Sequence, residues 1–182
     1  MIKVTGYNED WPKRFGEIRD CLYSELGDEA GAFEVEHFGS TAVPGLVARP
    51  LLDLCVVVPD ASQLPALLGG LDRLGYVYER TQGVPGLETF RRKGPDVPFL
   101  VHKRDFSPHH LYASVAGTAD LGRHLAFCDQ LKHSSDDRAA YAKLKIDLRA
   151  RTVAGQHRMT IIDSRIEVPG ILGGKGRGQQ FV

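Results

Sequence analysis

Hydrophobic and polar positions along the chain follow two different periods. Near the start, Phe15, Ile18, Leu22 and Leu26 recur at the spacing of one helix face, and Gly27 follows them as the expected end of a helix. Later stretches of the chain show helical patterning too. The helices expected from this period cover residues 11–26, 62–74, 121–133, 136–153 and 159–166.

Alternating or continuous apolar runs between these stretches predict β-strands. Residues 33–38 alternate apolar and polar side chains, whereas residues 51–58 form a β-branched run typical of a more buried strand. The strands expected from such runs cover residues 33–38, 51–58, 76–80, 88–92, 99–103 and 110–115. Together these elements predict an α+β fold, a mixed β-sheet flanked by helices, with a helical C-terminal third.

A single domain accounts for the 182 residues, because the chain shows no repeat and no low-complexity linker. We expect this domain to span residues 1–167 and the Gly-rich residues 168–182 to form a flexible tail. The longest apolar run, residues 51–58, is far shorter than the roughly 20 residues of a membrane helix. Residues 1–10 lack the apolar stretch of a signal peptide. A cytoplasmic protein without a membrane partner is therefore expected.

Charge and cysteine content narrow the classes of partner. The 23 Lys and Arg residues balance the 23 Asp and Glu residues, so the formal net charge is zero. This balance argues against bulk binding of nucleic acid, although it leaves room for a local basic patch. Three widely spaced cysteines fit neither a disulfide framework nor a paired-cysteine zinc site. We expect them to be free thiols in a reducing compartment.

The loop after the strand at residues 33–38 begins with Gly39, Ser40 and Thr41. A glycine at this point lets the backbone approach a bound group closely, since it carries no side chain. The two hydroxyls and the backbone N–H groups that follow are suitable donors to a phosphate. A turn glycine followed by a capping serine is the plain structural alternative.

Asp53 is an acidic residue within the apolar strand at residues 51–58. Because side chains of a strand alternate between faces, Asp53 shares one face with Leu51, Cys55 and Val57. A carboxylate among such neighbours is costly without a partner, which must be a cation, a metal ion or a set of hydrogen bonds. A salt bridge to Arg49 is the structural alternative to a functional site.

Several segments together resemble the GrpB-like family, whose fold is of the nucleotidyltransferase (polymerase beta-like) type. The segments that carry this resemblance are residues 7–12, 37–46, 50–53, 75–76, 85–86, 109–111 and 123–127. The resemblance implies binding of a nucleotide or another phosphate-bearing small molecule, with metal-dependent nucleotidyl or phosphoryl transfer as the activity. Relatives also occur fused behind dephospho-CoA kinase. That fusion implies the alternative of a non-catalytic accessory, protein-folding or interaction domain with a protein partner.

Carried over residue by residue, the resemblance makes Ser40 the phosphate contact and Asp53 the catalytic metal ligand, with Mg²⁺ or Mn²⁺ as cofactor. The position of a second carboxylate is occupied by Cys55, and a thiol is a poor ligand for Mg²⁺. The later strand at residues 110–114 supplies no third carboxylate. This departure favours a site that has lost its metal triad, which is the accessory-domain alternative.

Histidines and arginines complete the candidate site. His37, His109 and His110 could join Asp53 in a cluster for Zn²⁺ or Mn²⁺, but hydrogen-bonded histidines lining a pocket without metal are favoured. We expect the pocket to be lined by His37, Cys55, His110 and Tyr112. Together with Gly39, Ser40 and Thr41, the residues expected to contact phosphate are Arg49, Arg91 and Arg123. Tyr141 and Lys145 lie within reach of such a pocket on the helix at residues 136–153.

Overall fold

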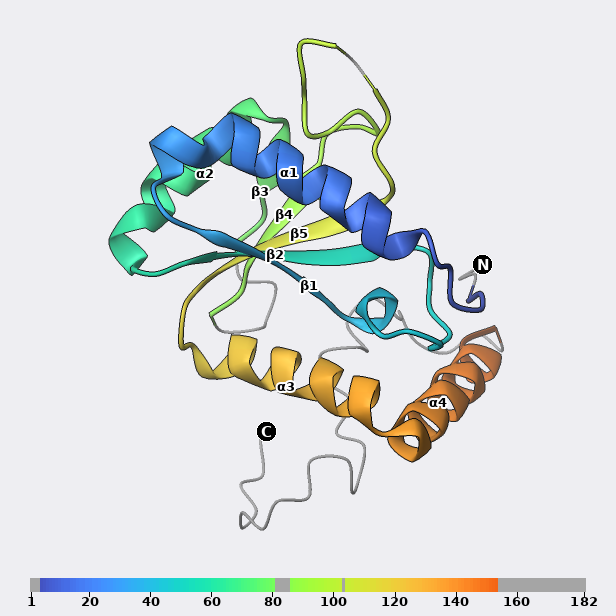
Figure 1. Cartoon of the computed structure of the whole chain (residues 1–182). Helices are drawn as coiled ribbons and strands as arrows, with labels where there is room; N and C mark the ends of the chain where they lie inside the picture. Colours follow the sequence, from blue (N-terminus) through green and yellow to red (C-terminus); the bar gives the residue numbers. More distant parts are fainter. Residues whose placement is uncertain (1–3, 81–85, 103, 154–182) are drawn as a thin grey trace.

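A mixed five-stranded sheet forms the centre of the molecule, with strand order β1-β2-β5-β4-β3 (Figure 1). The computed structural model describes residues 4–80, 86–102 and 104–153. The strands are β1 (Glu34–Phe38), β2 (Leu52–Val58), β3 (Tyr76–Tyr78), β4 (Glu88–Arg92) and β5 (His109–Val115). Strands β2 and β5 run parallel, and the other neighbouring pairs run antiparallel.

Helices cover both faces of this sheet (Figure 1). Helices α1 (Trp11–Ala30) and α2 (Leu64–Arg73) lie on one face, and α3 (Ala119–His133) and α4 (Ser135–Val153) lie on the other. Short 3-10 turns, η1 (Ser40–Ala42) and η2 (Ala61–Gln63), follow β1 and β2. The predicted fold class, a mixed sheet flanked by helices, is confirmed, and α3 and α4 make residues 119–153 almost wholly helical.

Two hydrophobic cores lie on opposite faces of the sheet, and β2 contributes to both. The first core lies against α1 and α2. The β2 side chains in it are Leu52, Leu54, Val56 and Val58. The second core lies against α3 and α4 and contains Cys55 and Val57 of β2. Because both faces of β2 are covered, its sequence is a nearly continuous apolar run rather than an alternating one.

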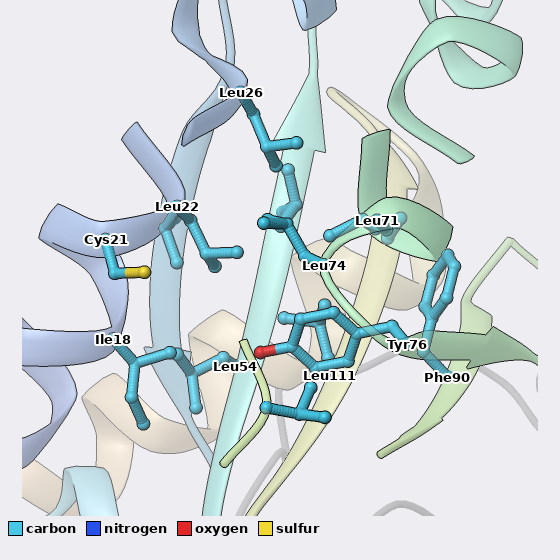
Figure 2. Packing of buried hydrophobic residues seen from close by; sticks show 14 of the residues in the cluster. Ile18, Cys21, Leu22, Leu26, Leu54, Leu71, Leu74, Tyr76, Phe90 and Leu111 are labelled. Atoms are coloured by element: carbon cyan, nitrogen blue, oxygen red, sulfur yellow. The ribbon is translucent and has the colours of Figure 1, made fainter. Parts of the chain in front are cut away.

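The first core shows how the apolar stripe of α1 is used. Figure 2 shows Ile18, Leu22 and Leu26 directed from α1 into the core that also contains the strand residues Leu54 and Leu111. All of these side chains are at most 1% exposed. The i, i+4 spacing along α1 therefore buries one helix face against alternate positions of the two central strands.

Some predicted element boundaries differ from the structure. Helix α1 continues past Gly27 to Ala30 and ends before Gly31, whose φ of 70° lies in the left-handed region. A Cβ at Gly27 would meet nothing within 4 Å, so this glycine lies in the helix without a steric need for it. The helix predicted at residues 159–166 and the tail predicted at residues 168–182 lie outside the described residues, as does the predicted domain boundary at 167.

The strand predicted at residues 99–103 is wrong over the part that the structure describes, since residues 99–102 form no strand. The Phe99 N–H donates to the Leu74 carbonyl at 2.8 Å, which ties this segment to the end of α2 and not to a sheet edge. Val101 is 97% exposed. The short apolar run that predicted a strand here is therefore not part of the sheet.

Within the described ranges, none of the helices combines the length and the apolar character that crossing a membrane requires.

All three cysteines, Cys21, Cys55 and Cys128, are free thiols with buried side chains, as predicted from their spacing.

The first core makes a testable contribution to stability. We expect Ile18→Ala to lower the free energy of unfolding by about 2–5 kcal/mol, because the side chain is fully buried and its removal leaves a cavity. The matched control is Ile146→Ala on α4, where the same truncation removes a side chain that is 52% exposed. Urea denaturation of both variants measures the difference. Equal losses would show that α1 does not pack as described.

Candidate functional site

The turn after β1 brings the backbone of Gly39 close to the carboxylate of Asp53. Gly39 has φ 72° and ψ −172°, a conformation that is essentially restricted to glycine. A Cβ built on Gly39 would lie 2.6 Å from Asp53 Oδ2, so the missing side chain is what allows the carboxylate to lie there. The layout implied by the nucleotidyltransferase resemblance, a Gly-Ser turn after one strand and an acidic residue on the next, is therefore present.

Asp53 has a histidine partner on the neighbouring strand. Register places Asp53 opposite Phe38 of β1 and opposite His110 of β5, on the sheet face that α3 and α4 cover. The His110 Nδ1 lies 3.1 Å from Asp53 Oδ1. Because a carboxylate can only accept, Nδ1 carries the proton of this bond. His110 thus supplies a partner for the partly buried carboxylate. Arg49, which was the structural alternative for pairing Asp53 and a predicted phosphate contact, is an exposed loop residue.

A buried lysine reaches the same turn from α4. The Lys145 side chain is 5% exposed, and its Nζ donates a hydrogen bond to Ser40 Oγ. The ammonium group also lies 5.4 Å from the centre of the Tyr141 ring. A buried charge needs such contacts to offset its lost hydration. The contacts place a positive charge beside the Gly39–Ser40 turn.

Two cysteines near the turn remain neutral thiols. The Gly39 N–H donates to Cys128 Sγ at 3.1 Å, and burial raises the pKa of Cys128 to about 11. Cys55 is fully buried between Glu36 and Tyr112 in the sheet register. Burial, with a smaller effect of Glu36, raises the pKa of Cys55 far above its ordinary value. Both thiols therefore act as packing groups at neutral pH and not as thiolates.

The residues around Asp53 do not fit a site for Mg²⁺ or Mn²⁺. These hard cations require several oxygen ligands, and a two-ion site requires bridging carboxylates. Asp53 is followed on its face by the Cys55 thiol, and β5 presents His110 and Tyr112 opposite them. Throughout residues 4–80, 86–102 and 104–153, no group of three or more His, Cys, Asp and Glu side chains is placed to hold a metal ion.

Two of the predicted histidines lie on the other face of the sheet. His37 pairs with Leu54 in the register, stacks on Phe15 of α1 with a ring-centre distance of 4.8 Å, and lies 3.0 Å from the Thr41 hydroxyl. His109 forms a 2.7 Å hydrogen bond with the buried Tyr76 hydroxyl. Each of them is a chain neighbour of a residue on the Asp53 face, so strand alternation points it away. The structure does not gather these histidines around Asp53.

The predicted arginines are engaged at the surface. Arg91 forms a 3.0 Å ion pair with Glu79, and Arg123 forms an ion pair with Asp120. Both guanidinium side chains are more than half exposed, at 58% and 64%. Ser40 and Thr41, by contrast, are buried. The residues predicted to contact phosphate are therefore divided between a buried turn and exposed side chains.

Two residues next to the Asp53 face were not among the predicted site residues. His124 of α3 lies against Phe38, with ring centres 5.6 Å apart, and Lys145 reaches Ser40. The signal for His124 is present in the sequence, because it occupies one helix stripe with Leu121, Cys128 and Leu131. Lys145 follows Tyr141 by four residues and shares its helix face. Helical spacing thus predicts that His124, and not the neighbouring Arg123, is on the face of α3 that packs against the sheet.

Similarity to known proteins extends over most of the chain. The family model described as GrpB protein matches residues 1–163. The UPF0157 protein BH1888 of Halalkalibacterium halodurans is 35% identical over 144 residues, which cover 79% of this chain and 67% of that protein.

Solved structures give similarities at two levels. The crystal structure of the conserved protein GrpB from Enterococcus faecalis aligns with a TM-score of 0.67 and 29% identity, over 93% of this chain and 92% of that one. A weaker similarity, with a TM-score of 0.44 and 16% identity, extends to Cid1 in complex with its short product ApU, over 70% of this chain and 39% of that one.

The close approach of Gly39 and Asp53 is testable by substitution. We expect Gly39→Ala to lower the free energy of unfolding by about 1–3 kcal/mol, since the backbone conformation excludes a Cβ. It should also displace the Asp53 carboxylate. The matched control is Gly117→Ala, where φ is also positive, at 78°, but nothing lies within 4 Å of an added Cβ. Urea denaturation gives the stabilities, and a loss no larger at Gly39 than at Gly117 would contradict the contact.

The two histidines on the α1 face predict a pH dependence of stability. Burial lowers the pKa of His37 from 6.5 to about 4 and that of His109 from 6.5 to about 3. Between these values and 6.5 the unfolded chain binds protons that the folded chain does not bind. Stability is therefore complete above pH 6.5 and falls with pH below it, by about 2 kcal/mol per histidine at about pH 5.

Urea denaturation at about pH 7.5 and about pH 5 measures this loss. Replacing both histidines, in His37→Gln/His109→Gln, should remove most of their contribution to the pH slope, whatever it does to the stability itself. The control His133→Gln changes an exposed histidine and should leave the slope as it is. A wild-type slope in the double variant would contradict the assignment.

Proposed function

The chain belongs to the GrpB protein family, and on that premise we propose that it binds a nucleotide or another phosphate-bearing small molecule at the turn formed by residues 39–41. The observation that carries this proposal is the buried ammonium group of Lys145, held against the Ser40 hydroxyl. The positive charge of Lys145 attracts an anionic ligand strongly in this position, because little solvent is present to screen the attraction.

Each group at the turn has a distinct part in this proposal. Lys145 supplies the positive charge, and Ser40 supplies a hydroxyl that can turn from lysine to a phosphate oxygen. Gly39 keeps the turn free of a side chain. The neighbouring Asp53 carboxylate would repel a phosphate, and His110 offsets this repulsion whenever its ring is protonated, because the two side chains are hydrogen-bonded.

Transfer of a phosphoryl or nucleotidyl group is the reaction class that we propose for this site. A divalent cation held by Asp53 is not part of the proposal, because the surrounding residues lack the oxygen ligands that such an ion requires. Arg49, Arg91 and Arg123 are more exposed than the turn, and their proposed place is at the rim of a bound nucleotide.

A specific observation favours a second candidate, a non-catalytic accessory domain. Cys55 occupies the position of the second carboxylate implied by the nucleotidyltransferase resemblance, and its thiol is fully buried and protonated at neutral pH. This candidate requires a stable complex with a protein partner and no binding of nucleotides.

Nucleotide binding by Lys145 is tested by calorimetry with ATP, GTP, CTP and UTP. We expect Lys145→Met to weaken the binding of the preferred nucleotide by about 10- to 100-fold, the effect of removing a charged hydrogen bond worth roughly 1.5–3 kcal/mol. The matched control is Lys143→Met, which removes an exposed lysine from the same helix. An unchanged Kd in Lys145→Met would contradict the proposed contact.

Thermal unfolding of the wild-type protein distinguishes the two candidate functions. A nucleotide present at about 100 times its Kd stabilises the folded state by about 2.7 kcal/mol, which is visible as a shift of several degrees in Tm. A shift with one of the four nucleotides supports the binding proposal. No shift with any of them favours the accessory domain.

A further inference from the structure

The Asp53–His110 pair is held by the two central strands of the sheet. Strands β2 and β5 are paired in parallel over their whole length, and Asp53 and His110 are direct partners in that register. Their hydrogen bond therefore joins two rigid elements and does not depend on a loop. A rigid frame of this kind keeps a histidine in one orientation, as acid–base chemistry requires.

The two side chains differ in exposure. Asp53 is 17% exposed, whereas His110 is 36% exposed. The carboxylate is thus the covered member of the pair, with the Gly39 backbone beside it, and the imidazole is the member that a reactant can approach. In known acid–base pairs of this kind, a covered carboxylate likewise holds an accessible histidine in the correct orientation.

The direction of the hydrogen bond determines which ring nitrogen is available. Nδ1 of His110 donates to the carboxylate, so in the neutral ring the lone pair is on Nε2. Nε2 lies on the opposite side of the imidazole from the carbon that joins the ring to the chain. The ring can therefore accept a proton at Nε2 while Asp53 stabilises the positive charge that results.

We propose that Asp53 and His110 form a metal-independent acid–base pair, in which His110 Nε2 is the catalytic base and Asp53 is its positioning residue. This rests on the proposed function, which places a phosphate-bearing ligand at the adjacent turn. The acceptor is the hydroxyl of water or of an alcohol, and its proton passes to Nε2. Its oxygen forms a bond to phosphorus as the bond from phosphorus to the leaving oxygen breaks. The electron pair of that bond stays on the leaving group, which takes the proton back from Nε2.

The pair accounts for features that a metal site does not. The Cys55 thiol next to Asp53 on its strand face is a poor metal ligand, but it is an acceptable packing neighbour for a carboxylate that binds a histidine. Lys145 supplies a fixed positive charge at the Ser40 turn, where charge on the transferring phosphate needs to be stabilised. A base and a positive charge for the transfer step are thereby both supplied by side chains of this protein.

The first experiment reads the protonation of the imidazole nitrogens directly. Long-range proton–nitrogen NMR spectra of the nitrogen-15 labelled chain, with His110→Gln to assign the signal, report which nitrogen of His110 carries the proton. We expect the proton on Nδ1 in the wild-type protein and a shift of population toward Nε2 in Asp53→Ala. The matched control is His133, whose Nδ1 is 2.7 Å from the Asp129 carbonyl and should be unaffected. A wild-type proton on Nε2 would overturn the pair.

The second experiment measures transfer with metal ions removed. The wild-type protein is incubated with ATP, GTP, CTP or UTP and excess chelator, and release of phosphate or pyrophosphate is followed. We expect a rate that persists without metal and a kcat that falls by about 10²- to 10⁴-fold in His110→Gln, with a smaller change in KM. His133→Gln serves as the control and should keep the wild-type rate.

The outcomes separate this inference from the proposed function. A rate that requires added Mg²⁺, an unchanged kcat in His110→Gln, or binding without turnover of any of the four nucleotides would each overturn the catalytic role. Failure of all four nucleotides to bind would overturn the proposed binding of a nucleotide and, with it, the role of His110 in transfer from a nucleotide. In that case the NMR result still decides whether Asp53 orients His110.

Discussion

The parallel pairing of β2 with β5 is the constraint on which the rest of the structure depends. These strands are central, and side chains from each of them pack against two separate cores on opposite faces of the sheet. Their register brings Asp53 and His110 together, although the two residues are 57 positions apart. Moving either strand by one residue would transfer every side chain on it to the opposite face, which the apolar residues of both cores prevent.

Strand alternation also divides the histidines into two groups with different physical roles. His37 and His109 are directed toward α1 and the first core, where burial keeps them neutral. His110 is directed to the face with Asp53 and is partly exposed. His109 and His110 are consecutive residues of β5, yet the first has a structural role and the second a chemical role. The difference arises because successive side chains of a strand point to opposite faces of the sheet.

Charged groups near Gly39 make two hydrogen bonds between distant parts of the chain. Asp53 is hydrogen-bonded to His110, and Lys145 donates to Ser40. The buried thiols of Cys55 and Cys128 add no charge, because burial raises the pKa of both. A site that combines a lysine cation with a carboxylate hydrogen-bonded to a histidine is better suited to an anionic ligand and to proton transfer than to the binding of a hard metal ion.

The sequence by itself determined most of the elements and the turn that carries the site. Helical and strand periods are local properties, so the helical face of Ile18, Leu22 and Leu26 and the buried run of β2 were predictable from neighbouring residues. The need of Asp53 for a partner was also predictable, because an isolated carboxylate in an apolar strand is costly. The apolar pattern at residues 99–102 misled the prediction, since no sheet edge is paired with that segment.

Only the tertiary structure decided which partners these residues have. The pairing of Asp53 with His110 depends on the register of two distant strands, and the contact of Lys145 with Ser40 joins residues 105 positions apart. Neither contact leaves a local signal, because side chains distant along the chain meet only through the packing of the elements that carry them. For the same reason the sequence named His110 as a pocket residue and Lys145 only as within reach of the pocket, whereas the fold brings His110 to Asp53 and Lys145 to Ser40.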